Sequence, residues 1–389
     1  MLNDVSFTIH PGKAPLPGAG EADTSFAVLP WRAWDTPEAR GAWDALAARA
    51  GTPNPFFEPW YLLPSLARFD PQQRIAIAAL LRGAVPEALV PVQRARRYGR
   101  HRLPHLAVWL HANAFLGAPI VAAGAEEAFW EALLDWADRN AGASAFLHAA
   151  ALPLETALAE ALLAVGARQR RRVVLVHREE RAMLASPLAP AAYLEHALPG
   201  KKRKELRRQQ ARLAEQGTLA VARRHDAEGI AAWIDHFLAL ELRGWKGEAG
   251  SALACAEATA GLFRESMTAA AGRGCLERLS LELDGAPIAM LATLIAPPGA
   301  FSYKTAFDER FARFSPGVLL QLENLALLER PGIRWADSCA APDHPMIDSL
   351  WRERRAIGRV SVAIGGAARR ALFGRIAAFE LSRNPQGLT

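Results

Sequence analysis

Cysteine is scarce in this chain of 389 residues, and the three cysteines present, Cys255, Cys275 and Cys339, lie far apart. An odd number of widely spaced cysteines argues against a disulfide framework and against a metal site built from CxxC pairs. The stretch MLNDVSFTIHPGK at the start lacks the basic residues and the long apolar core of a secretory signal peptide. We therefore expect a cytoplasmic protein without a metal ion.

Long apolar runs free of polar residues are also missing. Residues 103–125 contain no Asp, Glu, Lys or Arg, but they include His105, His111, Asn113 and two prolines. A membrane-spanning helix would have to satisfy all of these groups in hydrocarbon. We expect buried strands and a loop here, and peripheral contact with the inner membrane stays open.

Basic charge is concentrated in one place. The chain carries a net charge of +6, and residues 199–217 supply +5 of it, from seven basic and two acidic side chains. A general nucleic-acid binder would spread basic charge over a face or groove, so nucleic acid is not the expected partner. Leu206 and Leu213 have the spacing of a buried helix side. The basic face of this helix could attract coenzyme A phosphates or anionic lipid headgroups, or it could simply face solvent.

The two halves of the chain show the same order of predicted elements: a hairpin, a helix, and a strand that ends in a loop of small residues. In the first half these elements are predicted at 74–97, 126–140 and 142–153. In the second half they are a three-stranded meander at 276–307, a helix at 315–329 and a strand at 332–338. A further helix is predicted at 344–358.

This repetition predicts an α/β (α+β) fold with two related domains, each a mixed, mostly antiparallel sheet flanked by helices. We expect a flexible segment at 1–25, a first domain at 26–185 and a second domain at 190–385. The irregular stretch MLASPLAPAAYLEHALPG marks the connection.

Three runs in the second half resemble the CelD-like group of GNAT acyltransferases: KKRKELRRQQARLAEQG, LELRGWKGEAGSAL and FSYKTAFDERFARFSPGVLLQLENL. The resemblance covers about 195–365. The first half more loosely resembles the degenerate amino-terminal GNAT domain of Fem-type transferases, which implies two tandem GNAT-like domains. One departure is that RFSPG supplies a single glycine where simple GNAT enzymes have a glycine-rich pyrophosphate signature.

The resemblance implies acyl-coenzyme A as co-substrate and direct attack on its thioester. The helix start at Ser315, Pro316, Gly317 and Val318 would present backbone N–H groups to the pyrophosphate. Arg310 and Arg313 flank it and could pair with phosphate oxygens. An ordinary Ser-Pro helix start is the alternative interpretation.

The same resemblance suggests catalytic residues. His344 follows the second of the two strands between which the thioester lies, and Asp337 or Asp343 could orient its ring. Tyr303 lies on the first of these strands and is a further catalytic candidate. The alternative for His344 is a loop residue that caps the next helix. Cys339 is expected to be a buried thiol rather than a nucleophile.

Trp245, Lys246 and Lys304 are the predicted contacts to the acceptor. The predicted activity is N-acyl transfer from acyl-coenzyme A to an amine in a polysaccharide, lipid or long-chain-base pathway. The alternatives are a Fem-like transferase that uses aminoacyl-tRNA, and a non-catalytic GNAT scaffold or nucleic-acid-binding protein.

Overall fold

The computed structural model describes residues 23–383, which form two compact units. The first unit comprises the chain up to Arg178 and again from Ala356, and the second unit comprises Glu179–Arg355. The chain passes between them within two strands, β7 (Val173–Leu184) and β13 (Glu353–Ala363). Most of the predicted flexible segment 1–25 lies outside the described residues, and its end already belongs to β1.

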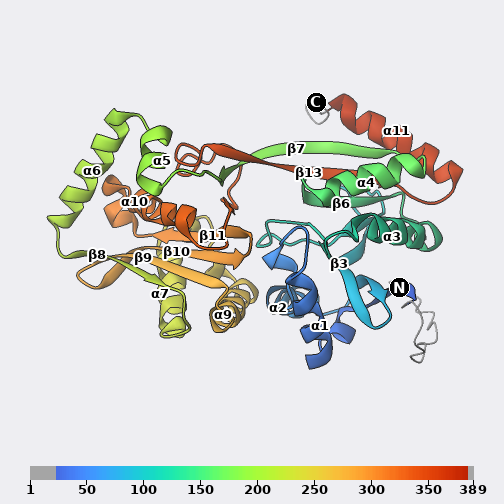
Figure 1. Cartoon of the computed structure of the whole chain (residues 1–389), viewed down its shortest axis with the longest axis horizontal. Coiled ribbons are helices and arrows are strands. Elements are labelled where there is room, and N and C mark those ends of the chain that lie inside the picture. Colours follow the sequence, from blue (N-terminus) through green and yellow to red (C-terminus); the bar gives the residue numbers. More distant parts are fainter. Residues whose placement is uncertain (1–22, 384–389) are drawn as a thin grey trace. The chain divides into compact units, whose positions relative to one another are not determined.

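The first unit is a sheet with the strand order β1-β2-β3-β4-β6-β13-β7. The strands not yet bounded are β1 (Thr24–Pro30), β2 (Ala76–Arg82), β3 (Val85–Ala95), β4 (His105–Val108), β5 (Ile120–Val121), which pairs with β3, and β6 (Phe146–Pro153). Its helices are α1 (Pro37–Ala47), α2 (Pro59–Phe69), α3 (Glu126–Asn140), α4 (Ala157–Arg168) and α11 (Ala367–Arg383) (Figure 1). The 103–125 stretch thus forms β4, β5 and loops, as its sequence predicts.

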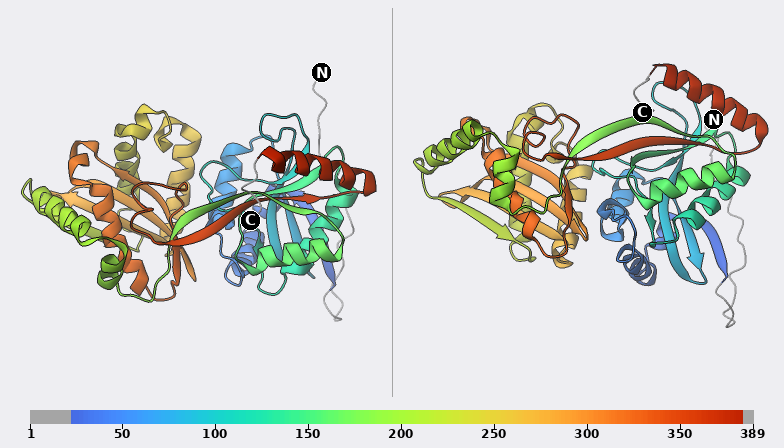
Figure 2. Two further views of the ribbon diagram at one scale, coloured as in Figure 1. Left: turned by 90° about the horizontal axis from the view of Figure 1, so that it is seen from above. Right: turned by 45° about the horizontal axis from the view of Figure 1, so that its top comes forward.

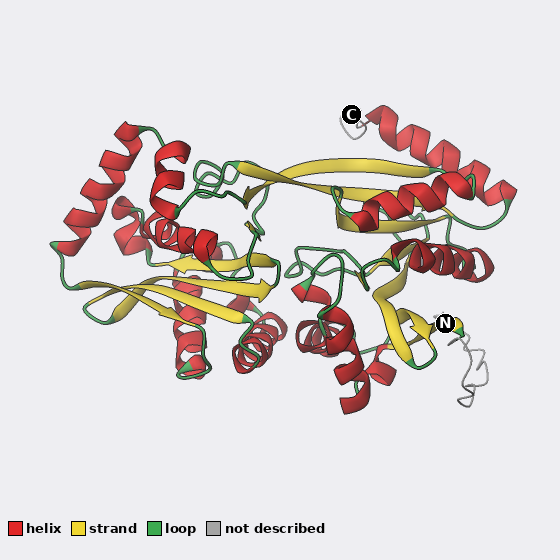
Figure 3. Ribbon diagram, viewed as in Figure 1, coloured by secondary structure: helices red, strands yellow, loops and turns green. Residues whose placement is uncertain are grey.

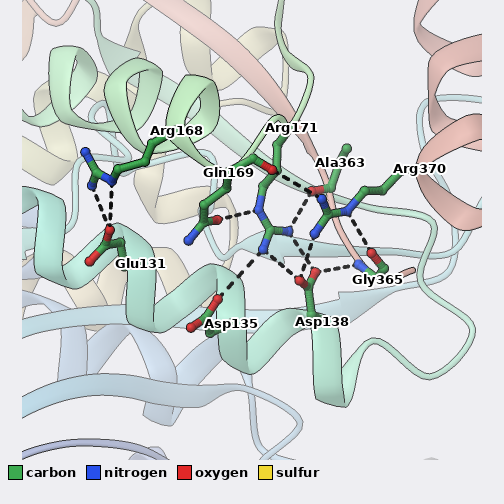
Figure 4. Close-up of polar contacts among 9 residues, drawn as sticks. All are labelled: Glu131, Asp135, Asp138, Arg168, Gln169, Arg171, Ala363, Gly365 and Arg370. Atoms are coloured by element: carbon green, nitrogen blue, oxygen red, sulfur yellow. Dashed lines mark hydrogen bonds and ion pairs between the residues drawn. The ribbon is translucent and has the colours of Figure 1, made fainter. Parts of the chain in front are cut away.

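Residues 356–383 belong with the first unit, whereas the sequence predicted one domain over 190–385. Strand β13 pairs antiparallel with β6 from Ile357 to Ala363. Asp138 of α3 then accepts hydrogen bonds from the buried Arg171, from Arg370 of α11 and from the backbone N–H of Gly365 (Figure 4). Sequence order does not reveal this return of the chain, because it depends on pairing over about 200 residues.

The second unit has the strand order β7-β12-β11-β10-β9-β8. Its strands are β8 (Leu219–Arg224), β9 (Leu276–Leu283), β10 (Ala286–Ala296), β11 (Gly299–Phe307) and β12 (Trp335–Asp337), of which only the pair β11–β12 is parallel. The helices are α5 (Pro190–Ala197), α6 (Gly200–Ala214), α7 (Ile230–Arg243), α8 (Trp245–Glu248), α9 (Glu257–Gly272) and α10 (Pro316–Glu323), with 3-10 segments η4 (Glu309–Phe314) and η5 (Asn324–Glu329).

Alternation along β9 places helices on both faces of this sheet. Leu279 and Leu281 pack in a core cluster with Leu213 of α6 and Leu320 of α10. Ser280 points the other way and accepts a hydrogen bond from the Trp233 indole of α7 at 3.2 Å. The views agree that α6 and α10 lie on one side of these strands and α7 and α9 on the other (Figure 1; Figure 2). The predicted mixed, mostly antiparallel sheets with flanking helices are confirmed.

Two predicted helices differ from the structure. The predicted helix 315–329 is α10 followed by 3-10 turns in η5. The predicted helix 344–358 is wrong: the segment is a loop that leads into β13, as Figure 3 shows. Tyr193 fixes this loop, because its hydroxyl donates to Glu353 at 2.8 Å and accepts from the Arg352 N–H at 2.9 Å. Of the helices in residues 23–383, none has the length and apolar character needed to cross a bilayer.

Candidate functional site

Strands β11 and β12 part in the middle of the second unit. They pair over only three positions, and the last pair is Phe301 with Asp337. Strand β11 continues to Phe307 along β10 alone, while the chain after β12 turns into a loop. The edge of β11 beyond Phe301 is therefore not paired with β12. The remaining residues of β11 and the loop after β12 are the candidates for catalytic residues.

A β-bulge lies next to this point. On β11, Ser302 is opposite Thr293 and Lys304 is opposite Ala292, so Tyr303 is the extra residue. Bulges redirect side chains and are frequent beside active sites. The Tyr303 ring stacks on Phe263 of α9 at 6.3 Å and is 3% exposed, so it is packed into the core on the α9 side.

Three charged side chains gather beside the bulge. Lys246 of α8 donates to the buried Glu241 of α7 at 2.9 Å and to the Thr305 carbonyl at 3.2 Å. Burial lowers the pKa of Lys304 to about 8, and repulsion from Lys246 adds to this effect. Lys304 therefore loses its proton more easily than an ordinary lysine.

The Trp-Lys loop is shaped by a close approach of two backbones. A side chain at Gly247 would place its Cβ 1.7 Å from the Leu242 carbonyl oxygen, so only glycine fits there. The Trp245 side chain is half-exposed, and the Trp245 backbone N–H donates to the Glu309 carboxylate at 2.6 Å. Residues of α8 and β11, among them Trp245 and Lys246, line a half-open pocket of about 20 Å³, which is room for about one water.

His344 lies in the loop after β12, close enough to Lys246 to be affected by its charge. Burial lowers the pKa of His344, and Lys246 lowers it further, so the imidazole is neutral at pH 7. Within residues 23–383, its Nδ1 is buried and has no hydrogen bond to another residue. No hydrogen bond joins His344 to Asp337 or Asp343 anywhere in the described chain, so the predicted orienting contact is absent from this structure.

The Asp337 side chain is fully buried, and all of its described partners are hydrogen-bond donors or cations. Its carboxylate accepts from Arg355 at 2.9 Å, lies 3.5 Å from Arg181, and accepts from the Cys339 N–H at 2.8 Å. The carboxylate thus holds the left-handed turn at Cys339, where φ is 52°, at the start of the loop that carries His344. In this geometry the Asp337 carboxylate is occupied by two arginines and the Cys339 N–H.

Cys339 is buried at the same turn. Burial raises the pKa of the Cys339 thiol well above its usual value, and the Asp337 carboxylate raises it further. A thiol that stays protonated is a poor nucleophile. This supports the interpretation of Cys339 as a small buried side chain.

The start of α10 has an unusual geometry. Ser315 is the N-cap residue in a left-handed conformation, with φ 54° and ψ 51°, and its hydroxyl makes no capping bond. Its carbonyl accepts from the N–H groups of Val318 at 2.9 Å and Leu319 at 3.0 Å, and Pro316 has no N–H. A Cβ on Gly317 would lie 2.9 Å from Met346 Sδ, so the Met346 side chain covers this glycine.

The two predicted phosphate contacts differ in their availability. Arg310 bonds both oxygens of Asp308, which raises the pKa of the guanidinium, so it would have to exchange partners to reach a phosphate. Arg313 is exposed and its guanidinium lies 4.6 Å from the Phe314 ring. The Arg313 carbonyl also accepts from Gln209 of α6 at 3.5 Å, so the basic helix lies directly beside η4.

Lys246 thus lies near enough to Lys304 and to His344 for its charge to act on both. Tyr303 is packed against Phe263, and the Lys304 ammonium lies 5.7 Å from its ring centroid. Asp337 is held by Arg181 and Arg355. Four residues of the site were not predictable from the sequence: Glu241, Arg181, Arg355 and Met346. A buried glutamate in a helix and two arginines among forty-six basic residues carry no local signal, because their importance comes from partners distant in sequence.

Residues 200–344 match the model of a family described as an acetyltransferase (GNAT) domain. No curated protein matches the chain in sequence. Among solved structures, FemX covers 87% of this chain and 98% of its own, at 10% identity and a TM-score of 0.54.

Two further structures are similar over most of their length. The C-terminal domain of a putative lysylphosphatidylglycerol synthetase from Agrobacterium fabrum covers 88% of this chain and 96% of its own, at 14% identity and a TM-score of 0.50. A conserved protein of unknown function from Bacteroides thetaiotaomicron covers 84% and 97%, at 13% identity and a TM-score of 0.52. At these identities the likeness concerns the fold.

Proposed function

We propose that this chain, whose residues 200–344 match a GNAT acetyltransferase domain, transfers an acyl group from acyl-coenzyme A to an amine acceptor. The observation that carries the proposal is the separation of β11 from β12 after Phe301 and Asp337, with the start of α10 between the two strands in sequence. It supplies an unpaired strand edge for the donor's amide groups and a helix start for its phosphates. The acceptor belongs to polysaccharide, lipid or long-chain-base metabolism.

In this proposal the donor's pyrophosphate binds at Ser315, Pro316, Gly317 and Val318. The N–H groups of Ser315 and Val318 already bond to the carbonyls of Ala312 and Ser315, so Gly317 supplies the backbone donor. Two further features fit the group. Gly317 has no side chain, and the atom that covers it is the end of the flexible Met346 side chain, which can move. Arg313 is exposed beside this start and supplies a positive charge.

The proposed reaction forms a nitrogen–carbon bond and breaks the carbon–sulfur bond of the thioester. His344 accepts the proton that the attacking amine loses, since its imidazole is neutral and its Nδ1 has no other partner. The thiolate that leaves takes up a proton, which His344 can return to it. Trp245, Lys246 and Lys304 surround the acceptor, and Glu241 holds Lys246 in place at 2.9 Å.

A second candidate is a transferase that takes its acyl group from aminoacyl-tRNA. The observation that favours it is the basic face of α6, where Lys201, Lys204, Arg207, Arg208 and Arg212 are all exposed. The face lies next to η4 and could follow a phosphate backbone. The two candidates differ in salt dependence, because RNA affinity that rests on several phosphate contacts falls steeply with salt.

Replacing Gly317 with valine should weaken coenzyme A binding at least about tenfold, which corresponds to about 1.4 kcal/mol. The branched side chain would occupy the space that the pyrophosphate needs. Titration calorimetry measures the loss. The double variant Gly317→Val/Met346→Ala relieves the contact at 2.9 Å and separates blocked binding from a displaced loop.

The matched control for this prediction is Gly272→Val, at a glycine of α9 where an added Cβ would meet no neighbouring atom within 4 Å. It should bind coenzyme A like the wild type. Wild-type affinity in a folded Gly317→Val protein would remove the start of α10 from the donor site.

A further inference from the structure

A second cavity lies at the other end of β12, away from the point where β12 parts from β11. Its volume is about 380 Å³. Four segments line it: the end of β7 with the residues after it (184–187), Leu327 and Leu328 of η5, the turn at Ile333 and Arg334, and Trp335 and Ala336 of β12. The proposed acyl transfer makes no use of this cavity.

Most of the residues that line the cavity are apolar, and the cavity is half-open to solvent. Leu184, Leu327 and Ala336 are buried members of the core cluster of the second unit, and Leu328 and Ile333 pack against that cluster. The volume lies within the range of about 300–1,000 Å³ that is typical of small-molecule sites. An apolar chain that covers these side chains removes apolar surface from water, which is favourable.

One cation lies in the lining, and it has no acidic neighbour there. Arg334 is exposed, and its backbone N–H donates to the Pro298 carbonyl at 2.8 Å. No ion pair or side-chain hydrogen bond of its guanidinium occurs within residues 23–383. Ser186 is the other polar residue of the lining, and it is uncharged. The combination of apolar walls with a single exposed guanidinium matches an amphipathic anion.

We propose that this cavity binds one saturated acyl chain whose carboxylate pairs with Arg334, as in a free fatty acid. Trp335 links the lining to the turn before His344. It is one of the lining residues, and the guanidinium carbon of Arg355 lies 4.3 Å from its ring centroid. Arg355 in turn bonds Asp337 at 2.9 Å. A bound chain thus touches a residue that supports the turn before His344.

Titration calorimetry of the full chain with octanoate, decanoate and dodecanoate tests the proposal. Each methylene added within the cavity should tighten binding about fourfold, because burial of a methylene lowers the free energy by a nearly constant amount. Absence of saturable binding, or an affinity that does not depend on chain length, would overturn the proposal.

The pairing of the ligand's carboxylate with Arg334 is tested with a neutral analogue of decanoate. Decanoate should bind the wild type more tightly than decanol, and this preference should disappear in Arg334→Gln. An equal preference in both proteins would remove Arg334 from the site. A one-chain anionic phospholipid that competes better than decanoate would contradict the assignment to a free fatty acid.

The position of the site is tested by filling it. Ala185→Trp and Leu328→Trp each place an indole in the lining and should weaken decanoate binding at least tenfold, whereas Ala326→Trp, at an exposed position of the same η5 segment, should not. Unchanged decanoate binding in filled variants that melt like the wild type would refute the location. All three variants should keep coenzyme A binding. A failure of this proposal can therefore be distinguished from a failure of the proposed acyl transfer.

Discussion

Replacing His344 with alanine should lower turnover by about 10²–10⁴-fold while coenzyme A binding is retained, because general acid–base assistance is typically worth that much. The imidazole is half-buried, its Nδ1 lacks a partner, and it lies near Lys246. Steady-state kinetics with a saturating acyl donor measures the loss. Calorimetry with coenzyme A confirms that the donor site is intact.

The pH profile gives the same prediction a second readout. Burial lowers the pKa of His344 below the ordinary 6.5. The base must be neutral to act, so turnover of the wild type should fall as the pH drops through this lowered pKa. The His344→Ala variant should lack that acidic limb. His196→Ala, an exposed histidine of α5, serves as the control and should keep both rate and profile. Near-normal turnover of His344→Ala would show that His344 takes no part in proton transfer and is only a residue of the loop.

Replacing Asp337 with alanine should lower the free energy of unfolding of the second unit by about 3–5 kcal/mol, as expected when one partner of a buried ion pair is removed. Arg355 and Arg181, whose side chains are 10% and 5% exposed, would lose the carboxylate that they share. Urea unfolding measures the stability. The rate at which Cys339 reacts with a thiol reagent reports on the turn that Asp337 holds, and this rate should rise.

The control for Asp337 is Asp348→Ala. Its ion pair with Arg354 at 2.8 Å is about one-third exposed on both sides, and such pairs contribute about 0–1 kcal/mol. If Asp337→Ala costs no more than this control, the buried cluster does not hold the loop. Asp337→Asn then distinguishes positioning from chemistry, because the amide can still accept from the Cys339 N–H while it cannot act as a base.

Elements with local signals could be predicted from the sequence. The meander follows from alternation along β9 and from the turns at Asp284-Gly285 and Pro297-Pro298-Gly299, and α1 follows from Thr36, whose hydroxyl accepts the Ala39 N–H at 3.2 Å. The candidate residues Lys246 and His344 follow from a family resemblance, and Lys304 from alternation along its strand; their roles stay predictions. In the structure the charge of Lys246 acts on both Lys304 and His344.

Features that depend on distant partners could not be predicted in this way. The loop at 344–352 has the composition of a helix, yet Trp351 is buried in the core and the Tyr193 hydroxyl accepts a hydrogen bond from the Arg352 backbone N–H. The return of β13 to β6 and the capture of Asp337 by Arg181 and Arg355 depend on residues far apart in the chain. Burial of Tyr303 against Phe263 likewise follows from the bulge in β11, which has no sequence signature.

Calorimetric titration of the wild-type chain with coenzyme A at physiological salt tests whether the second unit takes its acyl group from this donor. We expect saturable binding of one coenzyme A per chain, which Gly317→Val weakens and Gly272→Val does not. An absence of binding heat with coenzyme A, together with tight RNA binding at the same salt, would contradict the proposed function and favour the aminoacyl-tRNA alternative.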